Sequence, residues 1–132
     1  MESCVFCQIV KGLIPCYKIY EDDNFLAFLD IKPLNPGHTL LIPKKHFASV
    51  NDYEPFAQYW QIARKLAKII QQSLNPITVS YVVYGLGVSH AHIHLIPKFP
   101  HDGHPKGPNP TVTKRISPSK MSQIAQKINS LI

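Results

Sequence analysis

The chain has 132 residues, 45% of them hydrophobic, which predicts one compact domain over residues 1–132 with no second domain. No apolar run approaches the roughly 20 residues that a membrane helix needs, and Met1 is not followed by a basic and then apolar leader, so we expect a cytoplasmic protein without a membrane partner. The formal net charge of +6 favours anionic partners in general, but scattered lysines without interleaved aromatic residues argue against nucleic-acid binding.

The N-terminal part of the chain predicts one short helix and three strands. Residues 4–10 favour a helical turn that Gly12 closes. Runs of β-branched and aromatic residues bounded by Asp, Asn, Pro and Gly are typical of strands and turns. The strands are expected at 17–21, 25–30 and 38–43, and the turns at 22–24 and 32–37.

The longest expected element is an amphipathic helix at residues 55–74. Its apolar residues recur at the three-and-four spacing of a helix that packs one face on a core, and Asn75-Pro76 ends it. The repeat consists of Phe56, Tyr59, Ala63, Leu66, Ala67, Ile70 and Leu74. Core packing explains most aromatic residues of this region, so they do not indicate a nucleic-acid surface.

The remaining segments complete a mixed domain. Residues 77–84 and 90–97 predict two strands that pair, and residues 119–131 predict a C-terminal helix. Residues 97–110 are dense in proline and glycine, which predicts an exposed, flexible loop. The expected fold class is therefore α+β, with a mainly antiparallel sheet, one long amphipathic helix on one face and short terminal helices.

Three imidazoles occupy alternate positions in the second of these paired strands, at His90, His92 and His94. Successive side chains of a strand point to opposite faces, so we expect the three rings on one face. Two rises of a strand separate neighbouring rings by about 6.5 Å at the backbone, close enough for their tips to converge on one phosphate or one metal ion.

Alternating histidines are compatible with more than one chemistry. A neutral imidazole nitrogen can attack phosphorus when the other nitrogen holds the proton, and His92, with an imidazole on each side, is best placed to do so. His90 and His94 could then donate hydrogen bonds to phosphate oxygens or position the nucleophile. The same residues could instead ligate a metal, for hydrolysis or for structure, or form a purely structural cluster.

The cysteines indicate a second site. Cys4 and Cys7 form a C-x-x-C pair, which in a reducing compartment is typical of metal or redox chemistry, or of two ordinary thiols, rather than of a disulfide framework. Cys16 has no partner in this scheme and is expected to be a packed thiol.

Four segments taken together resemble the histidine triad (HIT) superfamily of nucleotide hydrolases and transferases. They are residues 4–10, 28–33, 37–46 and 90–97, and the resemblance covers about positions 4–99 in the expected order. It implies a HIT-like fold and an enzyme that cleaves at the α-phosphate of purine nucleoside phosphoramidates or dinucleoside polyphosphates, through a covalent nucleotidyl-histidine intermediate. The alternatives are a nucleotide-binding regulatory module with little turnover and a metal-dependent hydrolase with zinc at all three triad histidines.

The resemblance also implies roles for individual residues. His92 would be the nucleophile, His94 would contact the phosphate and leaving group, and Asp30 would accept hydrogen bonds from the ribose hydroxyls. A carboxylate suits a sugar diol because it can accept both donors at once. The pocket walls would include Phe28 and Ile31, and His38 would lie close to the triad.

A structural zinc ion and a homodimer follow from the same resemblance. Many bacterial members of the family look like zinc proteins, and the matching ligands here are Cys4, Cys7, His46 and the first triad residue, His90. Four ligands with no open position describe a structural ion. Family members commonly pair through the long helix and a neighbouring strand, so a homodimer is expected.

The chain departs from the familiar pattern just before the triad. Leu86 and Gly87 replace a Gly-Gln-Ser or Gly-Gln-Thr step whose amide and hydroxyl hold the phosphate in other members. We expect backbone N–H groups from Gly87 to Ser89 to bind the phosphate instead, because glycine lets a ligand approach the backbone closely. This departure leaves the physiological substrate open.

Overall fold

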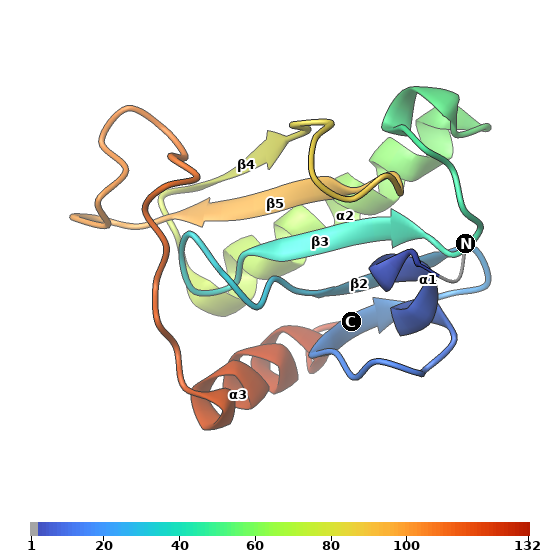
Figure 1. The fold of residues 1–132 in the computed structure, drawn as a ribbon. Coiled ribbons are helices and arrows are strands. Elements are labelled where there is room, and N and C mark those ends of the chain that lie inside the picture. Colours follow the sequence, from blue (N-terminus) through green and yellow to red (C-terminus); the bar gives the residue numbers. More distant parts are fainter. Residues whose placement is uncertain (1–2) are drawn as a thin grey trace.

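The computed structural model describes residues 3–132, which form a five-stranded antiparallel sheet between helices (Figure 1). The strand order is β1-β2-β3-β5-β4, so the histidine-bearing strand pairs with β3 on one side and with the edge strand β4 on the other. The strands are β1 (Lys18–Glu21), β2 (Phe25–Leu29), β3 (Thr39–Pro43), β4 (Thr78–Val82) and β5 (Ile93–Lys98).

Two helices cover one face of the sheet, α2 (Phe56–Leu74) and α3 (Pro118–Asn129). The apolar stripe of α2 and the buried side chains of α3 pack on the sheet in the larger hydrophobic core. Tyr59 is fully buried there, and its hydroxyl donates a 2.7 Å hydrogen bond to the Leu41 carbonyl. The buried phenol therefore has the partner that a polar group in a core needs. Within residues 3–132, no helix is long and apolar enough to cross a membrane.

A short helix, α1 (Val5–Val10), lies on the opposite face, in front of the sheet in Figure 1. Cys4 is its N-cap, and the Cys4 Sγ accepts a 3.3 Å hydrogen bond from the Cys7 N–H. Phe6 on this helix is buried with Leu26, Phe28, Leu40 and Ile42 in a smaller core. The central strands β2 and β3 are buried on both faces as a result.

The structure confirms the expected α+β class and most of the expected elements, with boundaries that differ by one or two residues. The start of β5 is the main exception, because the strand begins at Ile93 and not at His90. The Ala91 N–H donates to the Phe47 carbonyl at 2.6 Å, outside the sheet, so the chain joins the ladder only after His92. A short 3-10 helix, η1 (Val50–Asp52), was not expected from the sequence.

The loop that follows β5 is also less exposed than the sequence predicts. Asp102 and His104 are buried, so the prediction of an exposed loop is wrong at these residues. The Asp102 carboxylate accepts hydrogen bonds from the Phe99 N–H at 2.9 Å, the His104 N–H at 3.0 Å, the Asn35 Nδ2 at 2.8 Å and the Lys98 ammonium. These four donors satisfy a carboxylate that would otherwise be costly to bury.

Candidate active site

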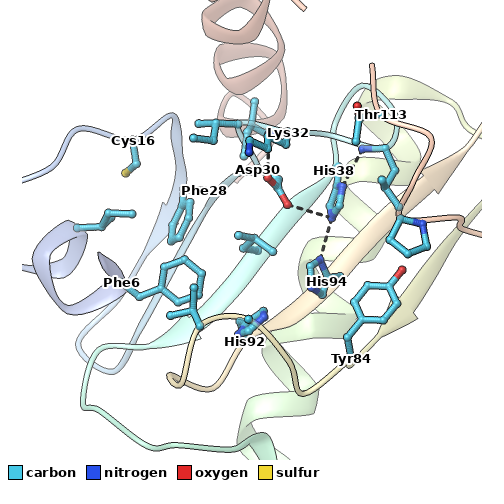
Figure 2. Close-up of a pocket in the computed structure, with 18 of the residues that line it drawn as sticks. Phe6, Cys16, Phe28, Asp30, Lys32, His38, Tyr84, His92, His94 and Thr113 are labelled. Atoms are coloured by element: carbon cyan, nitrogen blue, oxygen red, sulfur yellow. Dashed lines mark hydrogen bonds and ion pairs between the residues drawn. The ribbon is translucent and has the colours of Figure 1, made fainter. Parts of the chain in front are cut away.

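A cavity of about 620 Å³ opens on the α1 side of the sheet. Figure 2 shows Phe6 and Phe28 on one side of this cavity and Tyr84 on the other, with His92 and His94 between them. Its polar groups come from the end of β2, the start of β3 and the start of β5. An apolar cavity with a few convergent polar groups is the usual form of a small-molecule site.

The position of the proton on His92 follows from one backbone contact. The His92 Nδ1 lies 2.7 Å from the carbonyl oxygen of His90. A carbonyl can only accept a hydrogen bond, so the neutral ring carries its proton on Nδ1 and leaves the Nε2 lone pair free. His92 lines the cavity, and its ring packs edge-to-face against that of Phe6, with the two ring centroids 5.2 Å apart. The fold thus presents an unprotonated imidazole nitrogen for attack on an electrophile.

His94 carries its proton on the other nitrogen, because of a chain of hydrogen bonds. The Leu34 N–H donates to the His38 Nδ1 at 3.0 Å, so the neutral His38 ring keeps its proton on Nε2. This Nε2–H donates to the His94 Nδ1 at 2.9 Å, which leaves the His94 proton on Nε2. Burial lowers the pKa of each ring to about 4, so both are neutral at pH 7.

Asp30 lies at the end of β2, beside this chain of imidazoles. Its Oδ1 accepts a 2.9 Å hydrogen bond from the Lys32 N–H, and its Oδ2 lies 3.7 Å from the His38 Nε2 (Figure 2). Burial raises the pKa of the Asp30 carboxyl. One carboxylate oxygen is therefore held by the backbone turn, and the other can accept a ligand hydroxyl.

The structure brings most of the predicted nucleotide-binding residues together. Those that line the cavity are Phe28, Asp30, Ile31, His38, Gly87, His92 and His94. Ile31 is 76% exposed at the rim, and Gly87 adopts φ +85°, a conformation that favours glycine. Ser89 instead lines a neighbouring cavity with Cys4 and His46.

The His90 ring lies outside the cavity that His92 and His94 line. It is fully buried and contacts the His46 ring, with centroids 4.8 Å apart, while the centroids of the His92 and His94 rings lie 5.2 Å apart in the cavity. The rings of His90 and His92 both contact Phe6 of α1, so both lie on the α1 side of the sheet. His90 serves the cavity through its carbonyl and not through its ring.

The cavity lining also includes residues that were not assigned to the pocket from the sequence, among them Phe6, Tyr84 and Cys16. Phe6 lies between the two cysteines of the C-x-x-C pair, and its contact with Phe28, with ring centroids 5.7 Å apart, joins α1 to the pocket. Tyr84 places its ring centroid 5.0 Å from that of His94. Cys16, expected to be a packed thiol, also lines the cavity. No local pattern marks Tyr84, since its role depends on where the loop after β4 turns.

Cys4, Cys7, His46 and His90 form a separate cluster, in which the candidate ligand atoms all lie within 4.8 Å of one another. The His90 Nε2–H donates to the Pro43 carbonyl at 2.8 Å, so its Nδ1 is unprotonated, and this atom lies 3.4 Å from each of the two Sγ atoms. The His46 Nδ1 lies 3.2 Å from the Cys7 Sγ. Two thiols and two imidazoles, one of them oriented by a carbonyl, fit the donor set that zinc prefers.

Asp30, His38 and His94 form a second close group of potential ligands, but their proton positions disfavour a metal. The Leu34 N–H keeps the His38 proton on Nε2, the nitrogen that faces Asp30 and His94. The His94 Nδ1 accepts a hydrogen bond from this Nε2–H. A protonated nitrogen cannot ligate a metal. This arrangement argues against a metal ion held by Asp30, His38 and His94.

The family model described as the HIT domain matches residues 11–101 of this chain. The protein hit of Bacillus subtilis (strain 168) is 40% identical over 105 residues, which cover 74% of this chain and 72% of the relative. The adenosine 5'-monophosphoramidase hnt1 of Schizosaccharomyces pombe is 37% identical over 133 aligned positions, which cover 98% of each chain. A Zn-bound histidine triad family protein of Mycobacterium smegmatis superposes with a TM-score of 0.81, at 31% identity over 98% of this chain and 92% of that chain.

The lowered pKa values predict a loss of stability in acid. His38 and His94 have a pKa of about 4 in the folded chain, against 6.5 for an ordinary histidine. Between these values the unfolded chain binds more protons, so the free energy of unfolding falls as the pH falls from 6.5 to 4, by up to about 1.4 kcal/mol per pH unit for each histidine.

Urea unfolding at pH 7, 6, 5 and 4.5 measures this slope. We expect His94→Asn to make the dependence of the free energy of unfolding on pH shallower, because one of the two histidines whose protonation is disfavoured in the folded chain is removed. An equal slope in the variant and the wild-type protein would contradict the assignment.

Proposed function

The chain belongs to the histidine triad (HIT) family, and on that premise we propose that it is a nucleotide hydrolase or transferase that cleaves at the α-phosphate through a nucleotidyl intermediate on His92. The observation that carries the proposal is the 2.7 Å contact between the His92 Nδ1 and the His90 carbonyl, which leaves a free nucleophilic nitrogen in a nucleotide-sized cavity. Beside it, His94 offers a proton on Nε2 to the same space.

The reaction proceeds in two displacements. In the first, the His92 Nε2 forms a bond to the α-phosphorus, and the bond to the leaving group breaks with its electron pair. A phosphate leaving group departs as an anion, whereas an amine takes a proton from water. In the second, water attacks the phosphorus, its proton goes to solvent, and the P–N bond breaks to restore the neutral ring.

The neighbouring groups stabilise the charges that this path creates. When Nε2 bonds to phosphorus the His92 ring becomes cationic, and the His90 carbonyl stabilises it through the Nδ1–H. His94 remains neutral and donates its Nε2–H to a phosphoryl oxygen, where negative charge develops. Removing that proton would create an imidazolate, so His94 acts as a hydrogen-bond donor and not as a general acid.

The rest of the cavity suits a nucleoside. The Asp30 Oδ2 would accept the ribose hydroxyls, and Phe28 and Ile31 would supply apolar surface to the base. Leu86 and Gly87 offer no side-chain donor to the phosphate, which leaves backbone N–H groups to bind it. The relative named as an adenosine 5'-monophosphoramidase favours purine nucleoside phosphoramidates as the first substrates to test and dinucleoside polyphosphates as the second.

We expect a nucleotidyl adduct on His92 when adenosine 5'-phosphoramidate is mixed with the protein and quenched rapidly. His92→Asn should abolish the adduct and lower kcat/KM by about three orders of magnitude or more, because the nucleophile is lost. His101→Asn, an exposed histidine outside the cavity, is the matched control and should retain both. Intact-mass spectrometry detects the adduct.

Two other outcomes would contradict the proposal. Retained turnover in His92→Asn would exclude the covalent path. Nucleotide binding by the wild-type protein without turnover of either substrate class would indicate a regulatory binding module instead.

We further propose that Cys4, Cys7, His46 and His90 hold a structural zinc ion. Bound zinc would supply folding stability, because four protein ligands leave no open position for substrate. It would tie α1 to the sheet, and so hold Phe6 against the pocket.

Protein purified without chelator should contain about one zinc ion per chain. We expect Cys4→Ser to lower both the zinc content and Tm, since one of the four ligands is removed. Cys16→Ser, which lies outside the cluster, should change neither. Zinc-free protein together with an unchanged Tm in Cys4→Ser would refute the site.

We also propose that two copies pair through β4 and α2. β4 is an edge strand, and Tyr81 on it is 45% exposed beside the partly exposed Phe56 and the partly buried Trp60 of α2. The indole N–H of Trp60 is buried and has no hydrogen-bond partner within residues 3–132. An unpaired strand edge flanked by aromatic surface is a favourable site for a second chain.

Sedimentation equilibrium should give twice the chain mass of 14.9 kDa. Tyr81→Glu places a charge on the proposed interface and should shift the protein to the monomer. Leu13→Glu, at a position that is exposed but remote from β4, should remain dimeric. A wild-type monomer at tens of micromolar would contradict the pairing.

A further inference from the structure

His104 is a buried histidine that the proposed mechanism does not use. It is 1% exposed, and both of its ring nitrogens contact the backbone. The Nδ1 accepts a 3.0 Å hydrogen bond from the Asn109 N–H, so the neutral ring carries its proton on Nε2. The Nε2–H donates to the Leu34 carbonyl at 3.0 Å. His104 thus connects the loop after β5 to the loop before β3, which carries His38.

Lys114 holds the same short segment from a second side. Its backbone N–H donates to the Pro33 carbonyl at 2.7 Å, and its ammonium donates to the Leu34 carbonyl at 3.0 Å. The two peptide groups that flank Leu34 are therefore both held through their carbonyls. The first of them, between Pro33 and Leu34, also carries the N–H that donates to the His38 Nδ1.

Buried side chains anchor His104 itself. The Asp102 Oδ1 accepts the His104 N–H at 3.0 Å, and the Asp102 Oδ2 accepts from the Asn35 Nδ2 at 2.8 Å. Asn35 and Asp102 are both buried, so a lost contact would leave an unpaired polar group in the interior. Such networks hold one arrangement because partly satisfied alternatives are costly.

The direction of the Leu34 amide decides which atom His94 presents to the cavity. While this N–H points at the His38 Nδ1, the His38 proton must lie on Nε2 and the His94 proton on its own Nε2. If the peptide turned away, His38 could carry its proton on Nδ1 and accept from the His94 Nδ1–H. His94 would then present a lone pair, which repels phosphoryl oxygens.

We propose that His104 is a positioning residue. Its hydrogen bond to the Leu34 carbonyl, together with that of the Lys114 N–H to the Pro33 carbonyl, holds both sides of Leu34 so that the Leu34 N–H points toward His38, and this keeps the proton of His94 on Nε2. The effect on turnover rests on the proposed function, but the effect on the tautomers does not. His104 does not itself line the cavity and acts through the backbone of Leu34.

Two substitutions test the two hydrogen bonds of the His104 ring separately, the one that Nε2–H donates and the one that Nδ1 accepts. His104→Asn keeps an acceptor near the Nδ1 position for the Asn109 N–H but cannot reach the Leu34 carbonyl. His104→Gln keeps a donor near the Nε2 position. His101→Asn, an exposed histidine of the same loop, is the control. The full-length, metal-loaded protein is used throughout.

Proton–nitrogen correlation spectra of the imidazole rings report which nitrogen of His38 and His94 carries the proton. In the wild-type protein, His104→Gln and His101→Asn, we expect Nε2–H on both rings. In His104→Asn we expect a mixture of tautomers on His94, and a kcat about tenfold lower with KM changed less than threefold.

Each result decides the proposal. A folded His104→Asn protein with the wild-type tautomers would overturn the proposal. An equal loss of kcat in His104→Asn and His104→Gln would also overturn it. If the His104→Asn protein does not fold, the His104→Gln protein decides. Mixed tautomers on His94 in His104→Gln overturn the proposal, and wild-type tautomers in His104→Gln support it. If no nucleotide is turned over by the wild-type protein, the proposed function fails while the spectra still test this inference.

Discussion

A backbone carbonyl can only accept a hydrogen bond, and a backbone N–H can only donate one. In the two candidate sites, three histidines have their protons assigned by that rule, through the contacts of His90 with Pro43, of His92 with the His90 carbonyl and of His38 with the Leu34 amide. The first assignment leaves the His90 Nδ1 unprotonated toward the cysteines, the second leaves the His92 Nε2 unprotonated, and the third makes the His38 Nε2–H the donor to His94. The chemistry of the site therefore depends on main-chain direction as much as on side-chain identity.

His90 joins the two sites that these assignments create. Its ring faces the thiols of Cys4 and Cys7, while its carbonyl accepts the Nδ1–H of His92. Phe6, between the two cysteines, contacts the rings of both histidines. A disturbance of the cysteine cluster would move the carbonyl that orients the His92 ring, so the stability of one site and the geometry of the other are physically coupled.

Sequence reasoning was most successful where a contact is local or a motif is long. The helical spacing of 55–74 predicted α2 because a repeat of three and four needs no knowledge of the partner face. The resemblance placed Asp30, His38 and His92 in one pocket, as the structure does. It was wrong where the strand was extended back to His90, since β5 begins at Ile93, and where proline and glycine content was taken to mean exposure, at His104.

The sequence by itself determined the fold class, the family and the types of residue available for chemistry, because the periods of helices and strands and the order of motifs are written along the chain. Only the tertiary structure decided where the protons lie. The partner of the His90 Nε2 is 47 residues away, and the partner of the His104 Nε2 is 70 residues away. A tautomer follows from the atom that faces the ring, and for His90 and His104 that atom comes from a distant part of the chain.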